Sequence, residues 1–280
     1  MEYILLLLKT GVFRPYVFVF LAAFLFAAIN QIGWPRTWRF WLFSWATAFV
    51  CEYSSTRNGI PFGWYHYNGS TLGQELYVFN IPFMDSISFS FLLYAAYCVA
   101  LCLLLPIEQS SPSAHPLLQS LRFDLTARTR WSVLILTACL LAFIDMVIDP
   151  VALRGDRWFL GKIYYYPDPG WHFGVPFANY AGWAAVGLIS LTIYFPLERR
   201  LSHMILPASA TPRLVLSVGL YYGVLVFSLG MTFWIGEPFM GMSGLLMHLP
   251  ILILLMLRLA RSRSISPIEC PGGNRTKDFV

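Results

Sequence analysis

The chain has 280 residues, of which 58% are hydrophobic and only 12% are charged. A soluble domain usually has about a quarter of its residues charged, so this composition excludes an ordinary soluble protein and predicts an integral membrane protein. The formal net charge of +5 does not require a nucleic-acid partner, because the cytoplasmic loops of membrane proteins collect Lys and Arg. The five cysteines form no CxxC motif, and those in apolar stretches fit small buried side chains.

Seven stretches are near the length of about 20 residues that a bilayer requires. They cover roughly 12–32, 38–55, 82–105, 131–150, 179–197, 214–235 and 240–258. The second stretch is the least clean, because Arg39 and Glu52 fall inside it. Met1–Leu8 is too short for a signal sequence, so we expect no cleaved signal. We therefore predict an all-α polytopic bundle of about seven transmembrane helices in one domain, residues 1–260.

Lys and Arg lie mainly on the side of the predicted bundle that carries the C-terminal tail. The positive-inside rule then places the C-terminus in the cytoplasm and the N-terminus outside, as expected of a multi-pass protein of the cell membrane. The tail, 261–280, is rich in Ser, Pro and Gly, and we expect it to be disordered.

Two long loops on the predicted outer side are dense in aromatic residues and Gly, one over 56–69 and one over 154–176. Linkers exposed to water are rarely so aromatic, so we expect both loops to fold back as a lid over one end of the bundle. The alternative is that they are plain aromatic belts at the membrane interface.

Asp145 and Asp149 lie four residues apart near the end of one predicted span, so both carboxyls occupy one helix face. A carboxylate in hydrocarbon costs several kcal/mol unless it faces a cavity or a partner, so such acids are candidates for function. The same end of the bundle holds further polar residues: Glu52, Asp85, Asn179 and Glu237, with His248 about two turns below Glu237. The cytoplasmic halves of the predicted helices contain no acid. We therefore predict one polar pocket that opens outward beneath the aromatic loops.

Each of these residues also has a simpler explanation. Asp85 could complement a helix dipole, Asn179 could cap a helix, and Glu237 could be a surface turn residue. His66 and His172 lie in the aromatic loops and could be interfacial, and His248 could satisfy an interhelical hydrogen bond.

At these positions the sequence resembles the membrane-integral carotenoid biosynthesis family that includes gamma-carotene and bisanhydrobacterioruberin hydratases. The resembling blocks are Glu52 followed by Gly59-Ile-Pro-Phe-Gly-Trp-Tyr-His-Tyr67, Ile81-Pro-Phe, Asp145-Met-Val-Ile-Asp-Pro-Val-Ala152, Tyr166, and Phe173-Gly-Val-Pro-Phe-Ala-Asn-Tyr-Ala-Gly-Trp183. The DxxxDPVA and GVPxxNxxGW blocks are fairly specific in combination, and the likeness runs over most of residues 40–250.

The resemblance implies an enzyme that adds water across the terminal C=C of an acyclic carotenoid, such as gamma-carotene, lycopene or a bisanhydrobacterioruberin-like molecule, giving a tertiary alcohol. Such a hydration needs a proton donor, and we take Asp145 as the donor and Asp149 as the base that orients water, with the reverse assignment left open. Glu52 and Asp85 would form a second polar wall, and Asn179 would bind water. No cofactor or metal is expected.

Aromatic faces near the acids could stabilise the cationic intermediate that protonation creates. The candidates are Tyr65, Trp171, Trp183 and the run Tyr164 to Tyr166. We also count His66, His172, Glu237 and His248 among the possible substrate-binding residues.

Two alternatives remain open on the sequence: a carotenoid- or lipid-binding membrane protein without catalysis, and a magnesium-dependent membrane prenyltransferase. The second alternative arises because DxxxD can hold a diphosphate through Mg²⁺, but only one such motif exists and few basic residues lie near it. A diiron oxygenase would need many closely spaced His, and a retinal-linked opsin would need a Lys within a span; the chain has neither. The oligomeric state is not predicted.

Overall fold

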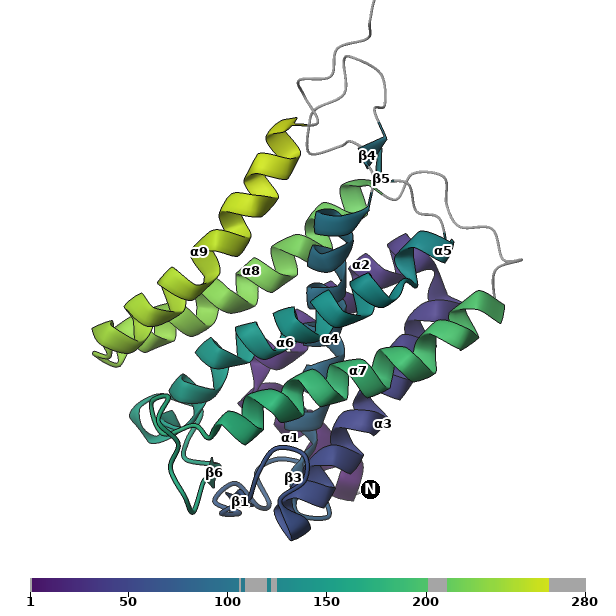
Figure 1. Cartoon of the computed structure of the whole chain (residues 1–280). Coiled ribbons are helices and arrows are strands. Elements are labelled where there is room, and N and C mark those ends of the chain that lie inside the picture. The colour runs from purple at the N-terminus through teal and green to yellow at the C-terminus, as the bar shows by residue number, and fades with distance from the viewer. Residues whose placement is uncertain (1, 106, 109–119, 122–124, 201–210, 262–280) are drawn as a thin grey trace, which may run out of the picture.

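The computed structural model describes residues 2–105, 107–108, 120–121, 125–200 and 211–261 (Figure 1). Within these ranges, each of the seven stretches predicted to be helical forms a helix. They are α2 (Pro15–Ile32), α3 (Trp34–Asn58), α4 (Phe83–Leu104), α6 (Trp131–Ala152), α7 (Phe177–Arg200), α8 (Thr211–Trp234) and α9 (Pro238–Arg261). A short helix precedes them, α1 (Glu2–Phe13), and α5 (Leu125–Arg128) leads into α6. The predicted all-α membrane bundle is confirmed.

Six of the described helices are long and apolar enough to cross a membrane: α2, α4, α6, α7, α8 and α9. Helix α3 is long enough but does not belong to this set, because Arg36, Arg39, Glu52 and Arg57 all lie within it. Two of these charges, Arg39 and Glu52, made the second stretch the least clean in sequence. The orientation in the membrane stays a prediction, and the predicted disordered tail beyond Arg261 lies outside the described residues.

Helix α4 is the axis of the bundle. In its apolar segment 78% of the residues are buried, against 28% in α9 at the edge of the bundle. Helices α2, α3, α6 and α8 all pack against it. Asp85 is the only charged residue of α4, so the helix is apolar on every side and can be surrounded by others. The ring of Tyr94 packs edge-on against Phe24 and Phe40, and its hydroxyl donates to Gln31 Oε1 at 2.8 Å.

The two aromatic loops meet at one end of the bundle. β1 (His66–Tyr67), from the loop after α3, pairs antiparallel with β6 (Tyr164–Tyr165), from the loop after α6. A second short pair, β2 (Tyr77–Val78) and β3 (Ile81–Pro82), leads into α4, while β4 (Ile107–Glu108) and β5 (Ser120–Leu121) pair near the opposite end (Figure 1). The loops therefore cover the bundle end as a lid, as their aromatic content predicts.

The opposite end of the bundle contains a buried acid, which corrects the prediction that the cytoplasmic halves of the helices have none. Helix α7 extends past the predicted end of its span at residue 197 and includes Glu198. The Glu198 carboxylate forms ion pairs with Arg36, at 3.0 Å, and with Arg128, and it accepts a hydrogen bond from Tyr194. Two guanidinium groups therefore neutralise this carboxylate and join α3, α5 and α7.

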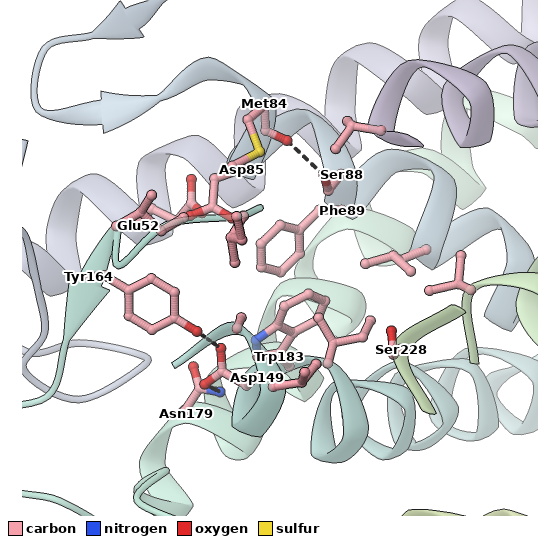
Figure 2. Close-up of a pocket in the computed structure, with 18 of the residues that line it drawn as sticks. Glu52, Met84, Asp85, Ser88, Phe89, Asp149, Tyr164, Asn179, Trp183 and Ser228 are labelled. Atoms are coloured by element: carbon pink, nitrogen blue, oxygen red, sulfur yellow. Dashed lines mark hydrogen bonds between the residues drawn. The ribbon is translucent and has the colours of Figure 1, made fainter. Parts of the chain in front are cut away.

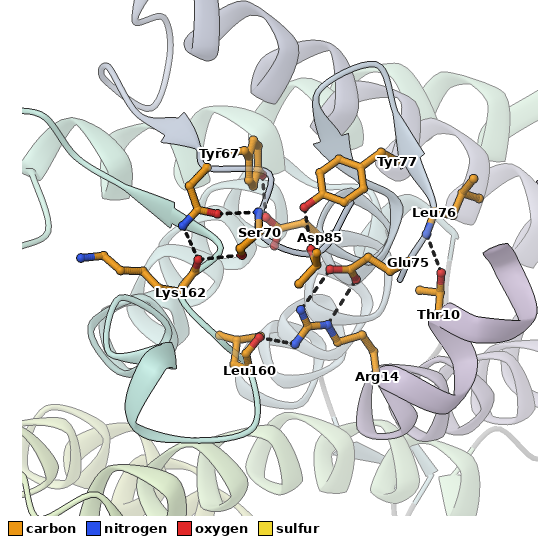
Figure 3. A network of polar contacts seen from close by, with 12 residues as sticks. Thr10, Arg14, Tyr67, Ser70, Glu75, Leu76, Tyr77, Asp85, Leu160 and Lys162 are labelled. Atoms are coloured by element: carbon orange, nitrogen blue, oxygen red, sulfur yellow. Dashed lines mark hydrogen bonds and ion pairs between the residues drawn. The ribbon is translucent and has the colours of Figure 1, made fainter. Parts of the chain in front are cut away.

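A second buried ion pair ties the start of the chain to the lid (Figure 3). Arg14, at the junction of α1 and α2, donates two hydrogen bonds to the Glu75 carboxylate at 3.0 and 3.2 Å, and a third to the Leu160 carbonyl oxygen at 2.5 Å. The Leu76 backbone N–H also donates to the Thr10 hydroxyl at 2.8 Å. Because the Arg14 and Glu75 side chains are fully buried, this clasp fixes both loops to the helix junction.

Replacing Arg14 with Met should destabilise the protein by about 3–5 kcal/mol, because Glu75 would keep a buried charge without a partner. Thermal unfolding in detergent measures the loss. The matched control is Arg157→Met, which breaks a partly exposed pair with Glu237 and should cost only about 0–1 kcal/mol. Adding Glu75→Leu to Arg14→Met should recover most of the lost stability. Equal melting temperatures for the Arg14 and Arg157 variants would contradict the role of the clasp.

Candidate functional site

A cavity of about 980 Å³, including the space at its mouth, lies beneath the two loops. Helices α2, α3, α4, α6, α7 and α8 contribute to its walls together with both loops. Figure 2 shows its polar groups gathered at one end, with Glu52 and Asp85 on one side and Asp149 and Asn179 on the other. The structure therefore brings together four polar residues that the sequence assigned to one pocket.

Asp149 is the most strongly hydrogen-bonded of the cavity carboxyls. Its Oδ1 accepts from the Tyr164 hydroxyl, and its Oδ2 accepts from the Tyr166 hydroxyl at 2.6 Å and the Asn179 side-chain amide at 3.0 Å. Both tyrosines come from the second loop, where burial and the charge of Asp149 raise the pKa of each hydroxyl well above its usual value. The hydroxyls therefore stay protonated and act as donors, and three donors stabilise a negative charge on Asp149.

Asp145 lies one turn before Asp149 on α6 and is fully buried, but it does not line the cavity. Its Oδ2 accepts from the same Asn179 amide nitrogen at 2.7 Å, and its Oδ1 has no hydrogen-bond partner. Asn179 therefore bridges the two carboxyls. The spacing of four residues correctly placed both on one face, yet it could not show that only Asp149 reaches the open space.

Glu52 and Asp85 form the opposite polar wall and differ in their partners. The Tyr67 hydroxyl donates to Asp85 Oδ2 at 2.5 Å, while Glu52 Oε1 lies 3.4 Å from the same hydroxyl oxygen. Glu52 Oε2 is buried without a hydrogen-bond partner. Burial and the adjacent Asp85 carboxyl raise the pKa of Tyr67, so its hydroxyl keeps the proton that it donates. Glu52 is therefore the lining carboxyl with the least support for a negative charge.

The alternation of the two short strands explains which loop side chains face the acids. Successive side chains of a strand point to opposite faces. In the β1–β6 pair, Tyr67 lies opposite Tyr164 and both line the cavity, whereas His66 lies opposite the exposed Tyr165 and does not. Tyr65 and Tyr166, one residue beyond each strand, follow the same alternation and also line the cavity.

Aromatic rings form much of the remaining wall next to the acids. The Trp183 indole stacks on Phe89 with ring centroids 4.0 Å apart and an angle of 20° between the planes. Figure 2 shows this stack between the acidic end and Ser228. The Tyr65 ring packs against Tyr67, Tyr164 and Tyr166. None of the described residues that line the cavity is Lys, Arg or His, so its three carboxyls have no cationic counterpart there.

Several residues predicted for the pocket lie elsewhere. Glu237 pairs with Arg154 and Arg157 at the turn between α8 and α9, because that turn carries it away from the cavity. His248 contacts Tyr221 and the Gly244 carbonyl oxygen within the α8–α9 side of the bundle. The Trp171 side chain is 76% exposed. Charge, aromatic character and sequence position suggested these residues, but none of the three indicates the direction in which a side chain points.

His172 is buried in the second loop without reaching the cavity. Its Nδ1 lies 2.5 Å from the Tyr180 hydroxyl, and its Nε2 has no hydrogen-bond partner. Burial lowers the pKa of the imidazole, which favours the neutral form. The sequence offered a position at the membrane interface as the alternative for His172. The ring is instead enclosed by the second loop and α7.

Sequence reasoning did not single out Tyr67 as a site residue and considered Tyr164 only as a cation-stabilising ring. Both are hydroxyl donors to the acids. The signal was present in the Tyr-His-Tyr run 65–67 and the Tyr-Tyr-Tyr run 164–166, because alternation within each run places its outer tyrosines on one face. The pairing of the runs was not apparent, since it joins segments almost a hundred residues apart.

The sequence model that describes the carotenoid biosynthesis protein family matches residues 12–250, which include every residue that lines the cavity. The chain belongs to this family. No curated protein and no solved structure matches the chain. Membership in the carotenoid biosynthesis family supports a role in making carotenoids, with a carotenoid-type substrate and a membrane setting.

Close packing at the cavity wall requires glycine at position 182, where α7 meets the first loop. Gly182 follows Asn179 by three residues on α7, and a Cβ atom there would lie 2.4 Å from the Phe62 ring and 2.9 Å from the Phe62 Cα. Phe62 itself lines the cavity, and its backbone N–H donates to the Ser55 hydroxyl at 2.9 Å. The absence of a side chain at Gly182 therefore lets the first loop lie directly on α7.

Gly182→Ala should lower the stability of the protein by about 1–3 kcal/mol, because the new methyl group overlaps both the ring and the backbone of Phe62. Thermal melting of the purified variant tests this. Gly223→Ala on α8 is the control, since no heavy atom lies within 4 Å of its added Cβ, and its melting temperature should stay close to that of the wild type. A Gly182 variant that melts with the control would show that Phe62 can move aside freely.

Proposed function

We propose that the protein is a carotenoid hydratase that adds water across the terminal C=C of an acyclic carotenoid end and yields a tertiary alcohol. The observation that carries this proposal is the composition of the cavity: three carboxyls and several aromatic rings enclose it, and no basic side chain among the described residues lines it. Such a lining suits a reaction that passes through a positively charged intermediate, because carboxylates and aromatic faces both attract cations.

The reaction balances without an added oxidant or reductant. A carboxylic acid transfers its proton to the CH carbon of the alkene, and the π electron pair forms the new C–H bond. The positive charge then rests on the carbon that bears two methyl groups. The oxygen of a water molecule forms a bond to that carbon, and a carboxylate accepts the proton that the water loses. One water is consumed, and the transferred proton is restored to the protein.

Glu52 is the proton donor that the geometry favours. It lines the cavity, it is buried, and its Oε2 has no hydrogen-bond donor to stabilise an anion. A carboxyl in such surroundings keeps its proton more readily than one with several donors. Asp145, the donor chosen on sequence grounds, shares the burial but is separated from the open space, so we assign it a positioning role behind Asn179.

Asp149 suits the second role, that of the base that orients water. A carboxylate offers about four acceptor positions, and Tyr164, Tyr166 and Asn179 occupy three of them. One position remains for a water molecule in the cavity. Because Glu52 and Asp149 lie on opposite sides of the polar end, the alkene can lie between the acid and the water (Figure 2).

The Trp183–Phe89 stack and the Tyr65 ring lie beside the acids and suit stabilisation of the carbenium ion. Each aromatic face contributes roughly 0.5–2 kcal/mol to the binding of a cation. Phe89 was not among the aromatic residues that the sequence suggested for stabilising the carbenium ion. No further cofactor is needed for the proton transfers.

A carotenoid-binding protein without catalysis is the second candidate, since the same cavity could hold a pigment unchanged. The prenyltransferase alternative gains no support from the geometry, because the described lining offers no Lys or Arg to hold a diphosphate. The experiments below separate hydration from binding.

Glu52→Gln should reduce turnover by about 10²–10⁴-fold, because it removes the transferable proton while keeping the shape of the side chain. The readout is the hydroxylated carotenoid, measured by mass spectrometry in cells that accumulate an acyclic carotene. Asp156→Asn, at an exposed acid in the second loop, is the control and should leave turnover unchanged. Asp145→Asn should reduce turnover less than Glu52→Gln. The opposite order, with Glu52→Gln active and Asp145→Asn inactive, would return the donor role to Asp145.

The oxygen of the product should come from water. Conversion in medium enriched in ¹⁸O-labelled water should give a labelled hydroxyl group, and conversion under labelled O₂ should give an unlabelled one. Label that enters from O₂ would replace the hydratase by an oxygenase, and bound but unmodified pigment in both media would favour the non-catalytic candidate.

A further inference from the structure

The cavity does not end at the acids but continues as an apolar arm between α2, α4 and α8. Besides the Phe89–Trp183 stack, the apolar lining includes Val17 and Phe20 from α2, Phe91 and Leu92 from α4, and Val224, Phe227 and Ser228 from α8. Figure 2 shows Ser228 at the end of the cavity away from Glu52 and Asp149. The arm is thus continuous with the acidic end and almost entirely apolar.

The direction of the arm follows from the helices that line it. Asp85, Phe89 and Leu92 are spaced by four and three residues, so they form one stripe along α4. Seven residues of α-helix rise by about 10 Å, so the arm runs from the lid into the membrane-spanning part of the bundle. A group bound at the acids would therefore have its apolar remainder directed down α4, not toward the lid.

The lid blocks the passage at the acidic end of the cavity. Arg14 and Glu75 are fully buried in their ion pair, and the β1–β6 pairing joins the two loops above the acids. The Asn68 amide and the Ser70 hydroxyl also donate to the Lys162 carbonyl oxygen (Figure 3). A long rigid molecule that entered through the lid would have to break these contacts together.

At the side of the arm, α2 and α8 meet through aromatic contacts, and Trp158 and Phe159 of the second loop pack against the same rings. The Tyr16 ring stacks on Phe227 with centroids 5.1 Å apart, and Phe20 meets the same ring edge-on at 5.8 Å. All three side chains are partly exposed, while Val17 and Val224 behind them are buried. Phe20 and Phe227 carry no charge and no hydrogen-bonding side-chain group, so these two rings can turn aside without leaving one unpaired, and the seam offers passage to a molecule dissolved in lipid.

We propose that the apolar arm is the binding site for the polyene chain of the substrate, and that the chain leaves the protein sideways into the bilayer between Tyr16 and Phe20 of α2 and Phe227 of α8. The inference rests on the proposed function in taking the bound molecule to be a carotenoid with its open-chain end at the acids. The inference assigns the choice between long and short isoprenoids to Val17, Val224 and Ser228, which line the arm.

The test measures binding of lycopene, an open-chain carotene, to the purified full chain in lipid nanodiscs by the visible absorption and induced circular dichroism of the pigment. Val224→Trp fills the arm, and we expect the apparent Kd for lycopene to rise by about tenfold or more. The matched control is Val226→Trp on the same helix, because Val226 is 67% exposed and Val224 only 4%. The control should bind lycopene as the wild type does.

A second pair fills the arm from the opposite wall and serves if Val224→Trp does not fold. Val17→Phe changes a residue that is 3% exposed, and its control, Val19→Phe, changes one that is 64% exposed on the same helix. Geraniol, which carries the same terminal alkene on a much shorter chain, should bind to the folded arm variants as it binds to the wild type, because it needs only the acidic end.

The outcomes separate this inference from the proposed reaction. Equal lycopene affinity in the arm variants and their controls overturns the arm, even if hydration occurs, and absence of lycopene binding by the wild type overturns it too. Selective loss of lycopene in the arm variants supports the arm, even if no hydroxylated product is ever found, in which case only the reaction fails.

Discussion

The structure depends on how it satisfies carboxyl groups inside an apolar bundle. A carboxylate among lipid chains is costly unless other groups of the protein surround it. Tyrosines of the lid loops supply hydrogen bonds to these carboxyls. Tyr67 donates to Asp85, and Tyr164 and Tyr166 donate to Asp149. The lid, the helices and the candidate site are consequently one unit, because the lid residues that cover the cavity also hold the acids in place.

The sequence was sufficient for the architecture. Apolar stretches near the length of a bilayer identified the seven long described helices, and the charges of α3 marked the one that fails as a simple span. The aromatic loops were recognised as a lid because water-exposed linkers rarely have such a composition. Hydropathy and composition are summed over many residues, so one atypical residue changes the predicted helix or loop little. Helix α1 and the extension of α7 to Glu198 were not predicted, because both depend on the exact residue at which a helix ends.

The sequence predicted which residues gather at the site better than it predicted the chemical role of each residue. Glu52, Asp85, Asp149 and Asn179 were grouped because the predicted helices place all four at the same end of the bundle. Helical spacing fixes the face of a residue but not its contacts, and Asp145 accepts a hydrogen bond from Asn179 without lining the cavity. The buried pair of Arg14 and Glu75 was equally hidden, because its partners belong to segments with no local pattern linking them.

The position of the acids at one end of the bundle has a consequence for the product. On the proposed reaction, the new hydroxyl group forms close to one surface of the membrane, while the rest of the polyene lies in the hydrocarbon. A carotenol released from this site is oriented from the moment of its synthesis, with its polar end in a single leaflet. On this proposal, modification of its other end by the same enzyme would require the molecule to turn over in the bilayer, which favours products with unlike ends.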